Sequence, residues 1–208
     1  IPNQQPKKGQ KTTGAHTLRI LAPSDMDTNF TLELLSADGR FVPVGFSSRK
    51  ILAGVVTEFS LSPKISASAF AVRIKSEEPV VAAISSNVTI KGRSDFVWSV
   101  PTLALVPMSI AMTGLSPLIA FAGDSIAIKM QVTLVNGKTT ITTIKGSDIA
   151  TWRVPKAARS ISILKVSEGS YAGALVASDN GYGYIPITPG SLLAKVETPR
   201  SNIRVLNP

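Results

Sequence analysis

Hydrophobic and polar residues alternate with a period close to two along most of the chain. Leu32 and Leu34 flank the polar Glu33, and the run SISI at 160–163 repeats the pattern. Such runs are rich in Val, Ile and Thr, and turn-forming residues separate them, as is typical of strands. The Asn-Gly pair at 136–137 predicts a hairpin with a type I′ turn, in which both central residues have positive φ. Because no stretch of a dozen residues carries the apolar stripe of a helix, the sequence predicts an all-β protein.

The segment 96–123 contains no charged residue and is long enough to span a bilayer as a helix. Pro101, Pro107, Pro117 and Gly114 interrupt it, however, and serine and threonine are scattered through it. Two buried strands joined by an apolar linker would have the same composition. We therefore predict strands here and disfavour a membrane span.

Four segments follow one another in the same order in each half of the chain, which is the pattern of an internal duplication. They are 32–40, 53–63, 72–84 and 94–101 in the first half, and 131–138, 147–155, 161–175 and 181–189 in the second. A sheet with one apolar face must cover that face with another layer. We therefore predict two tandem β-sandwiches, immunoglobulin-like or jelly-roll-like, at 16–107 and 108–208, after a polar linker or stalk at 1–15.

The stretch 101–117 joins the two predicted copies and is rich in Leu, Ile, Val and Met. A flexible linker would be polar, because exposed apolar side chains cost stability and favour aggregation. We therefore predict that this joint is buried between the sandwiches and locks them into one unit. The segment Ile203–Leu206 is expected to pair as a strand within a sheet.

Several turns and apolar strands of the first half resemble an uncharacterised ectodomain family, found at the C-terminus of actinobacterial membrane-anchored cell-envelope proteins. The matching positions are Pro23, Asp38-Gly39, Pro43-Val44-Gly45, Ala53-Gly54, Ser76 with Pro79-Val80-Val81-Ala82, and Asp95-Phe96 with Trp98. The second half departs from this pattern, with Ser170-Tyr171-Ala172 in place of Pro-Val-Val. The resemblance covers most of 17–208, carries no known chemistry, and implies an exported module.

The composition excludes several kinds of chemistry. The 208 residues include no Cys and a single His, so disulfides, Cys-ligated zinc, iron–sulfur clusters, thiol nucleophiles and sites that need two histidines are ruled out. The one histidine, His16, lies at the edge of the linker and is expected to be exposed. No Gly-rich loop follows a strand and opens a helix, so nucleotide binding has no support.

The acidic residues form no recognisable catalytic or metal-binding motif. The run Asp25–Asn29 alternates oxygen ligands as a calcium loop does, but Phe30 stands where such a loop needs Gly. We interpret the run as a polar turn. A glycosidase needs two carboxylates that converge on a sugar, and no such pair can be read from this sequence. We therefore predict no metal, no cofactor and no enzymatic activity.

Six residues are candidates for ligand binding. Arg153, Lys156, Arg159 and Lys165 form the densest basic run, and Tyr182 and Tyr184 share one face of a strand. The basic run could bind an anionic polymer, since the chain carries a net charge of +9. It could equally protect a sheet edge. The tyrosines could form an exposed ledge or pack against the partner sheet, and Trp98 is expected in the core.

These features favour a non-enzymatic extracellular module of a bacterial cell envelope, tethered by an anchor upstream of this chain. It would act as a structural spacer or platform, or bind an anionic glycopolymer or another envelope protein. Nucleic acid is a weaker partner, because aromatic residues are not interleaved with the positive charge. The alternative is a viral coat protein with a jelly roll and a basic arm of Lys7, Lys8 and Lys11, although a single jelly roll predicts no repeat.

Overall fold

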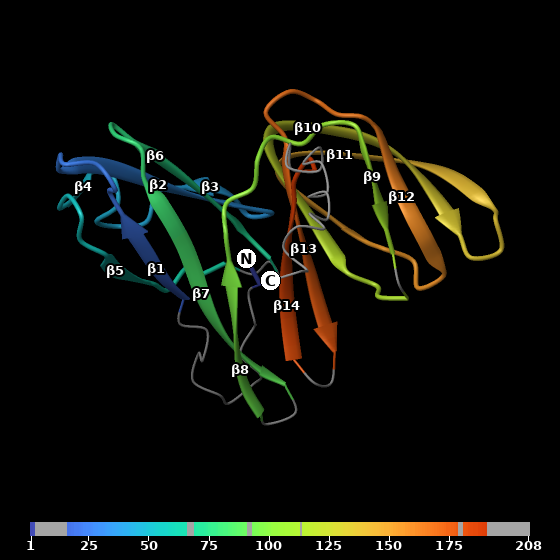
Figure 1. The fold of residues 1–208 in the computed structure, drawn as a ribbon, viewed down its shortest axis with the longest axis horizontal. Coiled ribbons are helices and arrows are strands. Elements are labelled where there is room, and N and C mark those ends of the chain that lie inside the picture. The colour runs from blue at the N-terminus through green and yellow to red at the C-terminus, as the bar shows by residue number, and fades with distance from the viewer. Residues whose placement is uncertain (3–15, 66–68, 91–92, 113, 179–180, 191–208) are drawn as a thin grey trace, which may run out of the picture.

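The computed structural model describes residues 1–2, 16–65, 69–90, 93–112, 114–178 and 181–190. Every regular element in these ranges is a β-strand, and the strands form three antiparallel sheets (Figure 1). The all-β prediction is therefore confirmed. Most of the predicted linker at 1–15 and the predicted strand at Ile203–Leu206 lie outside the described residues.

The N-terminal half, residues 16–107, contains two sheets that enclose one hydrophobic core. The first has the order β5 (Thr57–Leu61), β1 (His16–Leu21), β7 (Val81–Ile90) and β8 (Arg93–Ser99). In the second, β2 (Thr28–Ser36) pairs with β3 (Gly39–Phe41), β4 (Arg49–Ile51) and β6 (Ala71–Ser76). The inward residues of the period-two runs, among them Leu18, Leu32 and Leu34, are fully buried between the sheets with Phe70.

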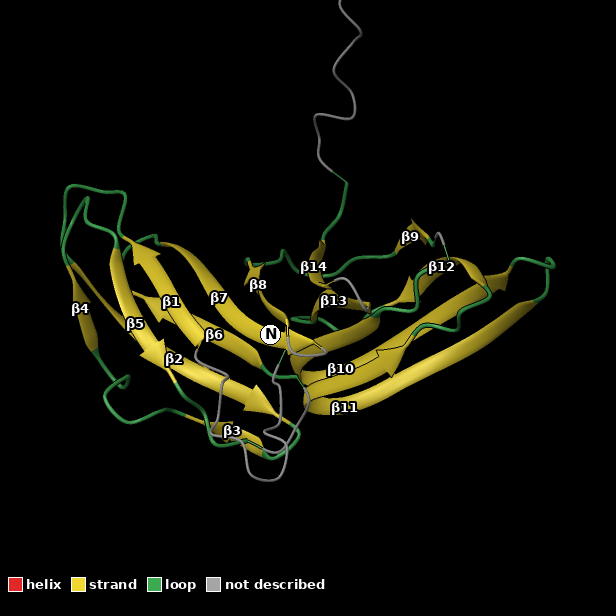
Figure 2. Ribbon diagram, turned by 90° about the horizontal axis from the view of Figure 1, so that it is seen from below, coloured by secondary structure: helices red, strands yellow, loops and turns green. Residues whose placement is uncertain are grey.

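The C-terminal half, residues 108–190, is built on one six-stranded sheet. Its order is β14 (Gly181–Ile187), β13 (Tyr171–Ser178), β10 (Leu118–Leu134), β12 (Ala158–Lys165) and β9 (Met108–Ala111), and β11 (Thr139–Arg153) also pairs with β10. The sheet curls around its own core, in which Phe121, Ile128 and Ile161 have no exposed surface (Figure 2). A bulge between Gly123 and Ile126 bends the long strand β10.

The two halves share one pattern of strand pairing. β1 pairs with β5 and β7, and the first part of β10 pairs in the same way with β11 and β13. β2 pairs with β3, β4 and β6, and the second part of β10 pairs with β11 and β12. The hairpins β7–β8 and β13–β14 complete the correspondence. The halves differ because residues 22–27 interrupt the strand path between β1 and β2, whereas β10 continues through its bulge.

The hairpin predicted at Asn136 and Gly137 joins β10 to β11, but its turn is not of type I′. Gly137 has φ of 82°, whereas Asn136 has no positive φ. The Gly137 amide donates to the carbonyl of Leu134, and the Leu134 amide donates to that of Lys138. This is the three-residue loop in which a single glycine takes the left-handed conformation.

The joint between the halves is not buried between them, so that prediction is wrong. The side chains of Leu103 and Val106 are 66% and 40% exposed. Leu105 is buried in the C-terminal core, and its amide donates to the Ser170 carbonyl at 2.7 Å. β9, which begins at Met108, pairs with β12. The second part of the joint is therefore a component of the C-terminal sheet, and the apolar residues there serve that core.

His16 is buried, contrary to expectation. It is 2% exposed, its Nδ1 lies 2.8 Å from the Ser86 hydroxyl, and its ring meets that of Phe70 edge-on at 5.0 Å. Within the described part of the chain, Nε2 has no hydrogen-bond partner. Burial lowers the pKa of His16 to about 4, so the ring is neutral at pH 7.

We predict that His16 makes the folded state less stable as the pH falls from about 6.5 towards 4. The unfolded histidine binds a proton in this window and the folded one does not, so the free energy of unfolding decreases with decreasing pH. The loss should reach about 3 kcal/mol, at 1.4 kcal/mol per pKa unit. Urea unfolding at pH 7.0, 5.5 and 4.5 measures it. His16→Gln, which can still hydrogen-bond to Ser86 but does not titrate, should remove this component, and an unchanged pH dependence would contradict the assignment.

Candidate binding cleft between the two halves

The halves meet along β8 and β14, which lie side by side at the centre of the molecule (Figure 1). The Tyr182 amide donates to Oδ2 of Asp95 at 3.1 Å, and the Tyr184 hydroxyl donates to the Val100 carbonyl at 3.0 Å. These contacts join residues more than eighty positions apart in the sequence. They align one edge of each half with the other.

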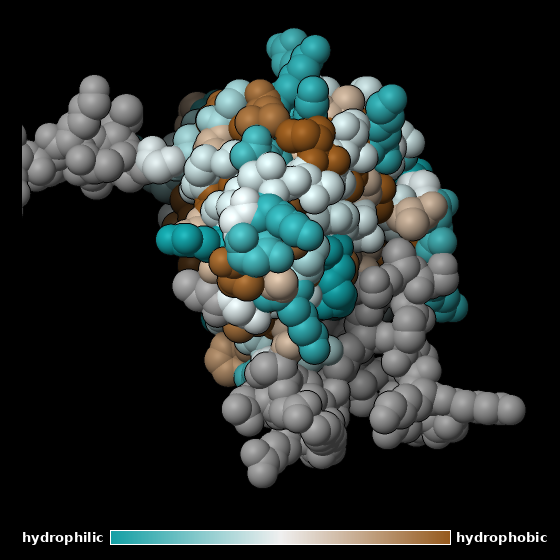
Figure 3. All heavy atoms as spheres, turned by 90° about the vertical axis from the view of Figure 1, so that its right-hand side faces the viewer, coloured by the Kyte–Doolittle hydropathy of each residue, from teal (hydrophilic) through white to brown (hydrophobic). Residues whose placement is uncertain are grey.

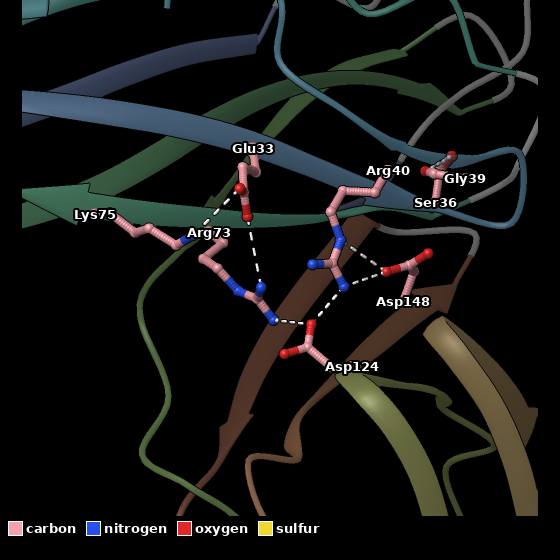
Figure 4. A network of polar contacts seen from close by, with 8 residues as sticks. All are labelled: Glu33, Ser36, Gly39, Arg40, Arg73, Lys75, Asp124 and Asp148. Atoms are coloured by element: carbon pink, nitrogen blue, oxygen red, sulfur yellow. Dashed lines mark hydrogen bonds and ion pairs between the residues drawn. The ribbon is translucent and has the colours of Figure 1, made fainter. Parts of the chain in front are cut away.

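A cluster of arginines and carboxylates forms a second connection (Figure 4). Arg40, on β3, donates from Nε and Nη2 to Oδ1 of Asp148 at 2.9 and 2.6 Å and also contacts Asp124. Arg73 on β6 donates to Oδ1 of Asp124 at 3.0 Å. Within the N-terminal half, Glu33 accepts from Arg73 and from Lys75. We call these six residues the interdomain ion cluster; it contains three positive and three negative side chains.

The local backbone explains how Asp124 and Asp148 reach the other half. Asp124 lies in the bulge of β10, and Asp148, opposite Gly123 on β11, has φ of 61°. Aspartate tolerates this left-handed conformation better than most residues. The hydrogen bond from Arg73, together with that from Arg40, lowers the pKa of Asp124, and the carboxylates of Asp148 and Asp124 raise the pKa of Arg40. Exposed ion pairs contribute little one by one, but a network fixes geometry more strongly.

A cavity of about 570 Å³ lies between these two connections. One wall is the inner surface of the N-terminal half between β6 and β7, including Leu35, Val72 and Ile84. The other wall is the face of β10 and β13 that points away from the C-terminal core, where Ala120 has a small side chain and the ring of Tyr184 lies over Gly173. The cavity is of the size that small-molecule sites usually have, and such sites often lie between domains.

The strand register gives the cavity two ends. At one end Ala122 pairs with Tyr171, beside the interdomain ion cluster. At the other, Leu175 pairs with Leu118 and with Tyr184. Leu118 and Ala122 are four residue steps apart along β10, so the ends lie about 13 Å apart at 3.3 Å per residue. Between these ends Ala120 presents a small side chain to the cavity, and the ring of Tyr184 covers Gly173.

Two hydroxyl groups belong to the end near Leu175. Burial raises the pKa of Tyr184 to about 12, and its ring lies directly over Gly173, where an added Cβ would be 2.6 Å from the ring. Ser99 is 7% exposed, and its hydroxyl oxygen, which has almost no accessible surface, has no hydrogen-bond partner among the described residues. An unpaired buried hydroxyl is costly unless a ligand or a water supplies a partner.

The basic candidates from the sequence lie outside this cleft, and the structure does not bring all four together. Arg153 at the end of β11, Lys156 in the following turn and Arg159 on β12 are exposed near one end of β12. Lys165 is at the other end, about 20 Å away at 3.3 Å per residue. Arg153 donates to the Ser116 carbonyl at 3.0 Å. The C-terminal face in Figure 3 shows hydrophilic and hydrophobic residues interspersed, and anion binding by these residues stays a prediction.

Of the aromatic candidates, Tyr184 reaches the cavity and Tyr182 contacts Asp95 through its amide. Trp98 is half-buried, with the Arg19 guanidinium 5.1 Å from its ring. Sequence reasoning missed Ser99 and Arg73. Ser99 carries no signal of its own, and the partner of Arg73 is distant in sequence. The sequence shows that Ser99 lies in an apolar run. A single serine in such a run does not predict a hydroxyl without a hydrogen-bond partner.

The described residues contain no group of three or more His, Asp or Glu residues arranged to hold a metal ion. In the same residues no helix is long and apolar enough to cross a membrane, and the uncharged segment 96–123 contributes to β8, β9 and β10. The calcium-like aspartate Asp27 instead forms an ion pair with Lys50 at 2.9 Å and accepts from the Ala53 amide.

Comparison with known proteins gives one family match. A model of a family of unknown function, DUF5719, matches residues 4–150. No curated protein matches the chain. Among solved structures, that of the PBSX exported protein XepA is similar over 78% of this chain and 75% of its own, at 14% identity. The TM-score is 0.25, so this similarity supports no argument about fold or function.

We predict that Gly173→Ala displaces the ring of Tyr184. The new Cβ would collide with the ring, which would then lose its hydrogen bond to Val100 and become more exposed. The pKa of Tyr184 should fall from about 12 towards 10, and the free energy of unfolding should drop by about 1–3 kcal/mol. Absorbance titration of the tyrosines measures the first effect. Gly183→Ala is the control, because its Cβ would have only an ordinary contact with Val176. An unshifted titration in Gly173→Ala would disprove the placement of the ring.

Proposed function

The chain belongs to the DUF5719 family of unknown function, and for this member we propose a non-enzymatic role outside the membrane of a bacterial cell envelope. It acts there as a rigid structural spacer or platform. The observation that carries this proposal is the double connection between the halves, through the interdomain ion cluster and through the contacts of β8 with β14. A spacer must keep its ends at a fixed distance, and two separated connections resist both bending and twisting.

The proposal includes an origin of the two halves by duplication, each half being a sandwich-like unit. The shared pattern of strand pairing supports it. In the N-terminal half, Leu18 on β1 faces Ile84 on β7. In the C-terminal half, Ile119 on β10 faces Ala174 on β13, and all four residues are buried. Under this proposal Ala174 corresponds to Ile84.

We predict that the full-length protein is accessible from outside the cell. Protease added to intact producing cells should degrade it, while a cytoplasmic marker protein survives until the cells are lysed. A product that stays protected in intact cells and fractionates with the cytoplasm would contradict the envelope proposal.

We predict a single narrow distance between the halves in solution. Because the chain has no cysteine, Ser60→Cys on β5 and Lys145→Cys on β11, both exposed, provide two unique spin-label sites. Double electron–electron resonance should give one narrow distribution. Adding Asp124→Asn and Asp148→Asn, which removes both carboxylates facing Arg40, should broaden it.

The control for this measurement is Glu58→Gln, which removes an exposed ion pair with Arg19 inside the N-terminal half. It should leave the distribution unchanged. A broad distribution in the unsubstituted chain would contradict the rigid spacer, and an unchanged width without the two aspartates would show that the ion cluster does not hold the halves.

A further inference from the structure

Two lysines lie directly opposite each other on neighbouring strands of the C-terminal sheet. Lys129 on β10 and Lys165 on β12 are Cα partners, and both are exposed. Like charges that face each other across a strand pair lower the stability of a sheet. Within the described part of the chain, neither lysine forms an ion pair that would offset this repulsion. The stability of the fold therefore does not account for the pair.

A bulge in β12 creates this pair. Met130 on β10 pairs with Ile163 on β12. An uninterrupted register would then place Leu164 opposite Lys129, but the extra residue brings Lys165 there. Bulges disrupt the ladder of hydrogen bonds and often redirect a side chain next to a functional site. Two features that each cost stability, the bulge and the like-charge pair, thus coincide at one point of the sheet.

The lysines belong to a face of β10, β11 and β12 that points away from the C-terminal core (Figure 2). Lys129 lies between Ile128 and Met130, which have no exposed surface, so its side chain points outward. On β11, Thr143 is the partner of Lys129, and the exposed Lys145 lies two residues further on the same face. Three lysines therefore occupy neighbouring outward positions on three adjacent strands.

The other outward positions of this face are mostly hydroxyl- and amide-bearing. Gln131 on β10 pairs with Ser162 on β12, and Thr133 pairs with Ser160. From 127 to 133, the outward residues of β10 and their partners on β11 and β12 include no acidic and no aromatic side chain. Hydroxyl and amide groups can hydrogen-bond to the hydroxyls of a sugar or polyol. Binding of single-stranded nucleic acid usually relies on aromatic side chains that stack on the bases.

The surrounding surface has an excess of the same charge. In the described part of residues 108–190, seven lysines and arginines stand against three carboxylates. Arginines of the N-terminal half bind two of these carboxylates, Asp124 and Asp148. Among these described residues, Glu168 is then the one carboxylate outside the interdomain ion cluster. A surface with such an excess of positive charge attracts polyanions.

We propose that this face binds an anionic glycopolymer, a chain of sugars or polyols whose repeats carry carboxylate or phosphate groups. Lys129, Lys145 and Lys165 attract these charges, and the neighbouring hydroxyl and amide side chains hydrogen-bond to the hydroxyls of the chain. Lysine contacts an anion as a point charge without bidentate geometry, so carboxylate and phosphate both fit. This inference goes beyond the spacer role and does not rest on it, since it depends on this face alone.

Fluorescence anisotropy of the whole chain with labelled polygalacturonate and with labelled poly(glycerol phosphate) tests the site and distinguishes the two anionic groups. At least one polymer should bind, and its affinity should fall as salt is added, because the charges are exposed. The methyl ester of polygalacturonate keeps the backbone but lacks the charge, and it should not bind.

Lys129→Gln combined with Lys165→Gln should raise the dissociation constant about tenfold, as expected for the loss of two exposed charge contacts. The matched control is Lys64→Gln with Lys156→Gln, which removes the same charge from exposed positions elsewhere. It should bind like the unsubstituted chain. In the absence of polymer, the face variant should also have a higher midpoint of urea unfolding, because the repulsion between the two lysines is gone.

The proposal is overturned if neither polymer binds, or if the control variant loses as much affinity as the face variant, since net charge alone would then explain binding. A lower midpoint of urea unfolding in the face variant would also overturn it, by assigning the lysines to the stability of the fold. Single-stranded oligothymidylate and vesicles that contain phosphatidylglycerol test the other partners. If either binds more tightly than both polymers and loses affinity in the face variant, the partner is nucleic acid or a membrane surface and the proposal is wrong.

Discussion

The arrangement of the whole molecule depends on the bulge in β10. Where the strand passes from Gly123 to Ile126, its pairing with β11 shifts, and Asp124 leaves the ladder. Its carboxylate then accepts hydrogen bonds from Arg73 and Arg40 of the other half (Figure 4). The same irregularity places Asp148 in a left-handed conformation beside Arg40. One extra residue in a strand thus bends the C-terminal sheet and fixes it to the N-terminal half.

The rest of the interface follows from this attachment. With the bulge held against β3 and β6, the outer face of β10 and β13 covers the open side of the N-terminal half. The small side chain of Ala120 leaves room between the two surfaces, whereas the Tyr184 ring fills the space over Gly173 and its hydroxyl donates to the Val100 carbonyl at one end. The cavity is therefore a consequence of joining two curved units at their rims and not at their centres.

The sequence allowed the strands to be anticipated, because they rest on local alternation and turn residues. Leu32 and Leu34 are buried as their spacing predicts, and the hairpin at Asn136 forms. The errors concern position in space. His16 is polar and close to a polar segment, yet Phe70, 54 residues on, encloses its ring. Leu103 is apolar, yet it is 66% exposed.

By itself, the sequence determined the class of fold, since period-two alternation dictates which side chains share a face of a sheet. It also determined that disulfides and two-histidine sites are absent. Only the tertiary structure decided that Arg40 meets Asp148, 108 residues away, and that Tyr184 rather than Arg153 reaches the cleft. The physical reason is that a charged or hydroxyl-bearing residue on a strand has the same local pattern whatever faces it. The packing of separate sheets determines which residue it contacts, and the local sequence of a single strand does not specify that packing.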